Sequence, residues 1–310
     1  VIILYALFSV QKKSYHWILC SVTGQIDCLV HNTGMTKGVD DAKNGQYSDV
    51  LVNRVKILED ADFLYIKNLC ENNDGWACVY DKKTTKVWTR NVPTSDFCMI
   101  KAHCHMPDVS ASVVYDVLHD PLYRSKWDHY MLNAEDVGLI NPNNDICYYA
   151  VGGMPPFRSR DFVMQRSWLD TGHEKFICSH SVCHEKYPPV KGYVRGVVFF
   201  TAYLIREADV GCHLMYATHS DPKGKLPAWL INRLTRVIGP RMLKKLHKAC
   251  LKYPAWKASN QPTWKPWIYP EQQANSVRIN LSDCQPRNYE QELIDESSVD
   301  AKDVNDDEVL

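Results

Sequence analysis

The stretch that decides the fold is Pro227–Tyr253, PAWLINRLTRVIGPRMLKKLHKACLKY. Its apolar residues recur every three or four positions, a spacing that lines one face of a helix: Leu230, Leu234, Val237, Ile238, Met242, Leu246, Ala249, Cys250 and Tyr253. The other face is basic, with Arg233, Arg236, Arg241, Lys244, Lys245 and Lys248. Gly239-Pro240 lies in the middle and should bend the helix, because proline removes a backbone hydrogen bond. Two interpretations stay open: a core-packing helix with a solvated basic face, or a lid over an apolar cavity that also contacts membranes.

Upstream of this helix the sequence predicts mostly strands. A short helix begins at Asp60 or Asp62 and runs through Leu69, and a second follows from Ser110 to Asp120, with a further turn from Pro121. The expected strands are 76–79, 86–89, 97–105, 131–139, 145–151, 161–169, 175–183, 193–205 and 211–219. Runs of strands bracketed by helices predict an α+β fold with an antiparallel sheet. Such a sheet curls as it twists, which leaves a concave face for the last helix to close.

Charge divides the chain into a basic body and an acidic tail. The 310 residues hold 36 basic and 36 acidic side chains, but the part from Glu271 onward carries 11 acidic and three basic ones. We therefore assign 57–270 to one folded domain and expect 271–310 to be an acidic disordered tail. We assign no function to residues 1–56 and expect them to be disordered or non-native. The 12 cysteines include no C-x-x-C pair, so we expect buried free thiols in a reducing compartment.

The densest group of functional side chains is Tyr123-Arg124-Ser125-Lys126-Trp127-Asp128. Arg124 and Asp128 are four residues apart and lie on one face of a helix, where they can form an ion pair. This pair is either an ordinary surface contact or a buried arginine, held by aspartate, that offers its planar guanidinium to a phosphate. The residues alone leave both possibilities open.

Other site classes find little support in the sequence. His103-Cys104-His105 lies along a predicted strand, where neighbouring side chains point to opposite faces. The chain contains no second group of ligands with zinc-finger spacing. We expect no metal site and no cofactor. The chain contains no G-x-S-x-G, P-loop, G-x-G-x-x-G or H-E-x-x-H motif, which argues against an enzyme. The basic face belongs to one amphipathic helix and not to a recognised nucleic-acid-binding module, which argues against nucleic acid.

Several motifs in order resemble the START (StAR-related lipid transfer) domain family, in its phosphatidylcholine-transfer branch: DVLHDPLYRSKWD, PFRSRDFVMQRSW, KYPPVKGYVRG, DPKGKLPAWLINR and KKLHKACLKYPAWK. The resemblance spans about Ile57 to Pro270. It implies a helix-grip fold, in which a curved antiparallel sheet and a long C-terminal amphipathic helix enclose a tunnel for one lipid. It also implies that the protein transfers phosphatidylcholine, phosphatidylethanolamine or both between membranes.

The resemblance assigns roles to particular residues. The headgroup site falls on Arg124, Asp128, Tyr149, Phe162, Phe199 and Thr201. The branch's choline cage differs here, because Phe replaces two phenols and Tyr149 replaces a tryptophan, which puts choline selectivity in doubt. The tunnel lining falls on Tyr203, Leu214, Tyr216, Thr218 and Leu230, and the gate on the loop 184–192 with the long helix. The membrane-facing residues are Arg233, Arg236, Lys244, Lys245 and Lys248.

The partners implied are a phospholipid and anionic membrane surfaces, for a monomer that is cytoplasmic and transiently membrane-associated. Ser297 lies in an acidic context, Asp295 to Asp300, and is a candidate for phosphorylation by an acid-directed protein kinase. The tail could compete with membranes for the basic helix face. The alternatives are a START protein for sterol or ceramide, a lipid sensor or scaffold without net transfer, and a hydrolase that uses Ser, His and Asp.

Overall fold

The computed structural model describes residues 53–93, 95–289 and 293–304, and the predictions for residues 1–52 lie outside this part. The described domain is a single mixed sheet with helices before, between and after its strands. The strands are β1 (Ala77–Lys82), β2 (Thr85–Arg90), β3 (Met99–Met106), β4 (Met131–Asn141), β5 (Asn144–Val151), β6 (Arg160–Asp170), β7 (Glu174–Ser181), β8 (Val194–Arg195), β9 (Val197–Glu207) and β10 (Cys212–Asp221). Their order across the sheet is β1-β2-β3-β10-β9-β7-β6-β5-β4, with all of these neighbours antiparallel.

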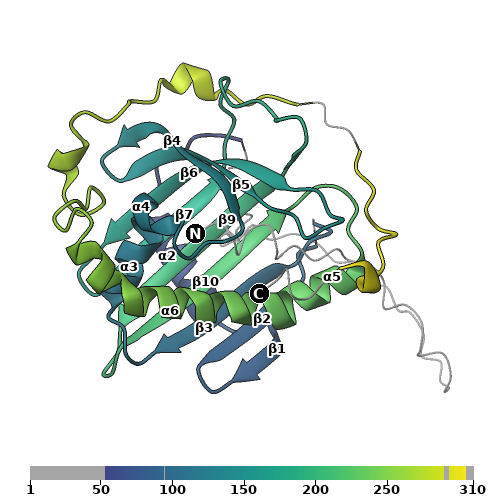
Figure 1. Ribbon diagram of the computed structural model, residues 1–310, viewed down its shortest axis with the longest axis horizontal. Coiled ribbons are helices and arrows are strands. Elements are labelled where there is room, and N and C mark those ends of the chain that lie inside the picture. Colours follow the sequence, from purple (N-terminus) through teal and green to yellow (C-terminus); the bar gives the residue numbers. More distant parts are fainter. Residues whose placement is uncertain (1–52, 94, 290–292, 305–310) are drawn as a thin grey trace, which may run out of the picture.

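The sheet separates two hydrophobic layers, and this confirms the predicted α+β architecture. On one face, β9 residues Phe200, Ala202 and Leu204 pack with helix α2 (Asp60–Glu71). On the other face, Tyr203 and Ile205 belong to the large core cluster that includes the last long helix. Period-two alternation along β9 thus buries both sides of this strand, as its continuous apolar sequence predicts. Figure 1 shows the long helix crossing the front of the sheet.

The stretch that decides the fold forms three consecutive helical segments. α5 (Ala228–Arg233) is followed by a π-helical turn, η1 (Leu234–Ile238), and by α6 (Gly239–Ala258). Pro240 is the second residue of α6 and follows the helical η1 without a break, so its missing N–H leaves one carbonyl of the preceding turn without an intrahelical bond. The Gly239-Pro240 pair therefore stands where the π-helical turn gives way to the α-helix, an irregularity of the kind at which helices kink.

Two expected elements differ in their extent. The predicted strand 193–205 divides at Gly196 into β8, which pairs in parallel with β6, and β9. The helix α3 (Ala111–His119) begins at Ser110, whose hydroxyl accepts from the Val113 amide, and the next turn is only α4 (Pro121–Arg124). The ten cysteines within the described residues are all free, and Cys78 alone among them is exposed.

The segment after Pro270 is not free of the domain, although its composition predicts disorder. It forms three short 3₁₀ helices, η2 (Pro270–Gln273), η3 (Leu281–Cys284) and η4 (Ala301–Asp303). Leu139 and Lys225 pair with Arg278 and Asp295 in isolated bridges. Three apolar side chains of this segment are buried in the domain: Cys284, Ile294 and Val304. The segment is therefore docked, although its average composition is that of a solvated chain.

Candidate functional site

One buried aspartate fixes the short helix that carries the candidate site. Asp120 caps α4 by accepting from the Leu122 and Tyr123 amides with Oδ1. Its Oδ2 accepts from the Tyr253 hydroxyl at 2.9 Å and from Lys257 Nζ at 2.8 Å, both on α6. The same carboxylate therefore starts α4 and attaches it to the long helix. Tyr123 adds a hydrogen bond from its hydroxyl to the Ala249 carbonyl, so the position of Arg124 is rigidly defined.

Arg124 is buried, with 7% of its surface exposed, which excludes the interpretation as a surface ion pair. Its Nη2 donates to the Leu118 carbonyl at 2.7 Å, and its Nη1 lies 3.7 Å from Asp128 Oδ2. The guanidinium carbon is 4.9 Å from the centre of the Trp127 ring. Within the described part of the chain, Arg124 Nη1, Asp128 Oδ1 and Trp127 Nε1 are buried and make no hydrogen bond. An unmet buried polar group costs about 1–3 kcal/mol, so these three atoms suit a polar ligand.

Asp128 is also the partner of Tyr149, whose hydroxyl donates to Asp128 Oδ2. Burial raises the pKa of Asp128, against the opposing effects of the Arg124 charge and the Tyr149 hydrogen bond. Burial and the neighbouring Asp128 carboxylate raise the pKa of Tyr149 well above 10. The sequence interpretation overlooked Trp127, although it stands three residues after Arg124 in the same motif and supplies the ring beneath the guanidinium.

The expected aromatic cage is only partly assembled. Tyr149 and Phe162 are directly paired across β5 and β6, and both are buried in the core cluster beneath α6. Phe199 does not join them, which corrects the expectation from the resemblance. The pairing of β9 with β10 shifts register so that Phe199 is an extra residue, and its ring stacks on His219 at 4.4 Å. A β-bulge redirects a side chain in this way, and the linear sequence gives no sign of it.

The expected tunnel residues form a second part of the same interior. Tyr203, Leu214, Tyr216 and Leu230 are buried in the core cluster, and the Tyr203 and Tyr216 rings are 4.9 Å apart. The hydroxyls of Thr201 and Thr218 are hydrogen-bonded at 2.6 Å, and both residues are buried. The face of β9 and β10 opposite α2 therefore combines aromatic surface with one pair of hydroxyls.

The START domain matches residues 56–257 of this sequence. This chain belongs to the START domain family. Mouse START domain-containing protein 10 is 39% identical over 249 residues, which cover 79% of this chain and 85% of the mouse protein. Mouse phosphatidylcholine transfer protein is 29% identical over 153 residues, 46% of this chain and 69% of that protein. The crystal structure of human STARD10 matches with a TM-score of 0.71 and 37% identity, over 76% of this chain and 96% of that one. The fold is thus the helix-grip fold of START domains, and the relatives support lipid transfer.

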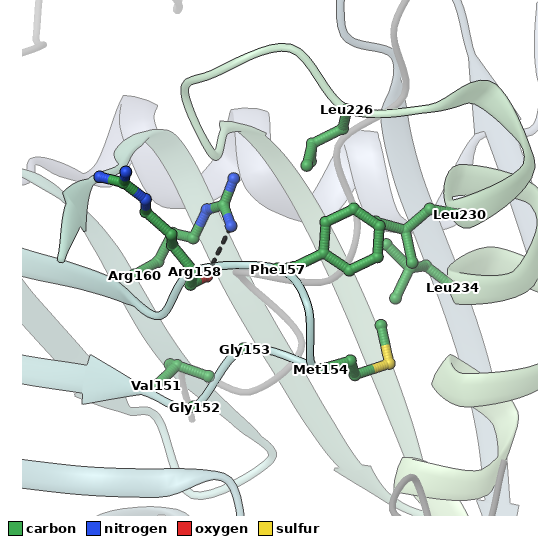
Figure 2. Close-up of a pocket in the computed structure, with 10 residues that line it drawn as sticks. All are labelled: Val151, Gly152, Gly153, Met154, Phe157, Arg158, Arg160, Leu226, Leu230 and Leu234. Atoms are coloured by element: carbon green, nitrogen blue, oxygen red, sulfur yellow. Dashed lines mark hydrogen bonds between the residues drawn. The ribbon is translucent and has the colours of Figure 1, made fainter. Parts of the chain in front are cut away.

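Two loops lie at different faces of the START sheet. Residues 152–159 lie against α5 and η1, where Met154 and Phe157 face Leu226, Leu230 and Leu234 around a pocket of about 30 Å³ (Figure 2). The Phe157 and Trp229 rings are 6.0 Å apart. In the loop 184–192, Tyr187 stacks instead on Tyr148, which alternates with the core residues of β5 and so points to the opposite face of the sheet. The loop that packs against α5 and η1 is therefore 152–159.

The five basic residues that we expect to face membranes differ in their exposure. Arg236, Lys244 and Lys248 are exposed, whereas Arg233 and Lys245 are partly buried. Lys245 Nζ lies 5.6 Å from the centre of the Tyr130 ring, and burial lowers the pKa of this lysine. The tail carboxylates of Asp295 and Glu296 pair elsewhere, with Lys225 and Arg160, so these two do not cover the basic face.

The described residues of this START domain contain neither a metal-binding cluster nor a membrane-spanning helix. No group of three or more His, Cys, Asp or Glu side chains in that part of the chain is placed to hold a metal ion. No helix there is both long enough and apolar enough to cross a bilayer.

Proposed function

We propose that this START protein binds a single glycerophospholipid, phosphatidylcholine or phosphatidylethanolamine or both, between its sheet and α6, and transfers it between membranes without chemical change. The observation that carries this proposal is a trio of buried atoms that make no hydrogen bond within the described residues, Arg124 Nη1, Trp127 Nε1 and Asp128 Oδ1. Two are donors and one is an acceptor. A zwitterionic headgroup, with an anionic phosphate next to a cationic amine, complements this set.

The two donors suit the phosphate, because a charge-assisted bond from a guanidinium is among the strongest available to it. Asp128 Oδ1 can accept from the primary ammonium of ethanolamine. Choline offers no N–H donor, but the faces of Tyr149 and Phe162 can attract a quaternary ammonium. A sterol carries a hydroxyl and no phosphate, so it would offer Arg124 Nη1 no anionic acceptor. This difference favours a phospholipid over a sterol.

Transfer follows from the apolar interior. Two acyl chains hold roughly thirty methylene groups, each worth about 0.8 kcal/mol on leaving water, so free desorption is very slow. A tunnel lined by residues such as Tyr203, Leu214 and Tyr216 replaces the bilayer as an apolar environment. The exposed Arg236, Lys244 and Lys248 would approach anionic lipids at a cytoplasmic membrane face during transient association, about 1 kcal/mol each near the surface. The protein acts as a monomer in this mechanism.

The tail offers a point of regulation at Ser297. This exposed serine donates from Oγ to Asp295 Oδ1 at 2.6 Å, and Asp295 also pairs with Lys225 at 3.1 Å. A phosphate added by an acid-directed kinase would repel Asp295 and the adjacent Glu296, and so weaken the tail's attachment. A Ser297→Glu variant should change liposome binding, and unchanged binding would leave Ser297 an unmodified serine in a tail.

The proposal is tested by identifying the lipid that copurifies with the full chain and by measuring transfer between vesicles. Native mass spectrometry should show one intact glycerophospholipid per protein, and labelled phosphatidylcholine or phosphatidylethanolamine should move from donor to acceptor vesicles. A copurified sterol or ceramide would overturn the phospholipid assignment. Binding without movement would indicate a sensor or scaffold, and a lysolipid product would indicate a hydrolase.

A further inference from the structure

A second pocket lies outside the headgroup site, where the chain turns back after α6 and passes the edge strand β4 (Figure 1). Its volume is about 340 Å³, which is in the range of small-molecule sites. We call it the tryptophan pocket, because its walls include Trp168 of β6 and Trp264 and Trp267 of the segment after α6. Arg124, Asp128 and Tyr149 are not among its lining residues.

The aromatic wall is held rigidly. The rings of His119 and Trp267 are stacked with 5.6 Å between centroids and 8° between planes, and His119 meets Trp168 edge-on at 5.2 Å. Trp264 meets Trp267 edge-on at 5.9 Å. Trp267 Nε1 also donates to Asp116 Oδ1 at 2.8 Å, which fixes the post-α6 segment to α3. The pocket is therefore preorganised, and a ligand would lose little affinity to ordering its walls.

Two buried polar atoms of the lining have no partner within the described residues, His119 Nε2 and Gln273 Oε1. Each residue is 4% exposed. The Gln273 amide nitrogen donates to the carbonyls of Pro142 at 3.1 Å and Pro266 at 2.6 Å, so the orientation of the amide is fixed and its oxygen remains an acceptor. Burial lowers the pKa of His119 well below 6.5, with Arg166 adding to the effect, so this ring is neutral at physiological pH and adds no positive charge.

The ionic groups of the pocket leave an excess of negative charge. Arg166 is committed to Asp145, with Nε 2.8 Å from Oδ1 and a second contact from Nη2. Asp136 lies 3.9 Å from Arg166, and its side chain is 66% exposed. One arginine thus faces two carboxylates, the buried Asp145 and the exposed Asp136. Lys257 Nζ lies 5.4 Å from the Trp264 ring centre and 5.6 Å from the Trp267 ring centre, but Asp120 neutralises it and it does not line the pocket.

We propose that the tryptophan pocket binds a small organic amine in its protonated form, with an apolar body of the size of a phenyl ring. Tryptophan faces attract an ammonium group by the cation–π interaction and bury the apolar body. Gln273 Oε1 accepts from the ammonium, and Asp136 supplies the opposite charge. This binding is independent of the phospholipid, and the two sites can be occupied together.

The test uses the full chain loaded with phospholipid, phenethylamine hydrochloride as the probe, and 2-phenylethanol as its uncharged isostere. Binding is followed by calorimetry and by the indole N–H signals in ¹⁵N-resolved spectra. The amine should bind saturably and about tenfold more tightly than the alcohol, because only the amine gains the ionic contribution. Trp264→Leu should weaken both probes. Asp136→Asn, an exposed substitution that leaves the core intact, should weaken the amine about threefold and leave the alcohol unchanged.

Asp81→Asn, which removes an exposed carboxylate from β1, is the matched control and should change neither affinity. The proposal is overturned if the amine shows no saturable binding up to about 10 mM, a limit below which even weak fragment sites are detected. It is overturned equally if the amine binds no more tightly than the alcohol, or if Trp264→Leu has no effect. Binding seen only after the phospholipid is removed would place the amine in the lipid tunnel and also exclude this site.

Discussion

The guanidinium of Arg160 and the carboxylate of Glu296 form a buried ion pair, with 2.7 Å between Nη2 and Oε2, although 136 positions separate them in the chain. The second carboxylate oxygen of Glu296 accepts from the Arg158 amide at 2.7 Å. Trp229 of α5 donates from Nε1 to the Val299 carbonyl at 2.8 Å. The C-terminal segment therefore bridges the loop 152–159 and α5, the two sides of the pocket shown in Figure 2.

Replacing Glu296 by alanine should release this bridge. Loss of one partner of a buried ion pair is strongly destabilising, but Arg160 keeps the carbonyls of Arg158, Pro222 and Lys223, so we expect a loss of about 2–4 kcal/mol in the free energy of unfolding. Vesicle-to-vesicle transfer should become faster, because α5 and the loop 152–159 would separate more easily. Release of the C-terminal segment should appear as faster cleavage of that segment in limited proteolysis. Glu271→Ala, at an exposed position, is the control. A released tail with unchanged transfer would show that the bridge has no role in gating.

Replacing Arg124 by leucine should abolish phospholipid transfer while the protein stays folded. A charge-assisted hydrogen bond is worth about 1.5–3 kcal/mol, so lipid affinity should fall by one to two orders of magnitude. The fold should survive because leucine fills much of the same space, and burial already raises the pKa of Asp128, which favours its neutral form. Thermal unfolding and phospholipid transfer should be measured for this variant and for the control Arg278→Leu, a change at an exposed arginine. Normal transfer by the Arg124 variant would remove this residue from the mechanism.

The sequence could predict those features that depend on local spacing. The four-residue separation of Arg124 and Asp128 brings them together in the structure, with 3.7 Å between Nη1 and Oδ2. The apolar periodicity of 227–253 likewise predicts the face that α6 buries. Local spacing could not reveal whether Arg124 is a surface residue or a buried one. Its burial depends on the hydrogen bonds of Asp120 and Tyr123 to α6, which join residues more than 120 positions apart.

Features that depend on pairing register or on a few distant contacts could not be predicted. Phe199 leaves the cage because of a bulge between β9 and β10, which strand alternation cannot anticipate. The acidic tail has the composition of a disordered segment, yet Glu296 meets a buried arginine and Ile294 is buried. Composition averages over a segment, whereas two or three specific contacts are enough to dock it.

Gly196→Ala should disturb the aromatic part of the headgroup site. A Cβ at this position would lie 2.3 Å from Phe162 Cε1, so the Phe162 ring must move from its place beside Tyr149. Overpacking of this kind costs about 1–3 kcal/mol. We expect a lower Tm and weaker lipid loading, measured by thermal unfolding and by mass spectrometry of the copurified lipid. Gly172→Ala has no heavy atom within 4 Å of the new Cβ but a φ of +86°, and should lower stability without changing lipid loading. Equal lipid loading by both variants would show that Phe162 is not near the lipid.

Lys101→Met should change how stability depends on pH. Lys101 is fully buried, with Nζ donating to the Leu69 and Asn72 carbonyls at the end of α2, and burial lowers its pKa to about 8. The unfolded lysine has a pKa of about 10.4, so between these values the unfolded chain binds more protons and the lysine's contribution to stability rises with pH. The free energy of unfolding of wild type minus that of Lys101→Met should therefore increase from pH 7.5 to 9.5 in urea titrations. The exposed Lys83→Met should give a flat difference, and a flat or falling curve for Lys101 would contradict the assignment.

Reversing the charge of Lys244 and Lys248 should weaken membrane binding without affecting the interior. Both side chains are exposed on α6, on the face opposite the buried Met242, Leu246 and Ala249. Each lysine near an anionic surface contributes about 1 kcal/mol, so the double change to glutamate should lower vesicle affinity at least tenfold and slow transfer in proportion. The effect should shrink as salt is raised, because exposed charges are screened. Sedimentation with phosphatidylserine vesicles measures the vesicle affinity.

The control is the double variant of Lys82 and Lys83 to glutamate, which makes the same change in net charge on the β1–β2 hairpin. Equal losses of vesicle affinity by the two variants would show that net charge, not the α6 face, directs the protein to membranes.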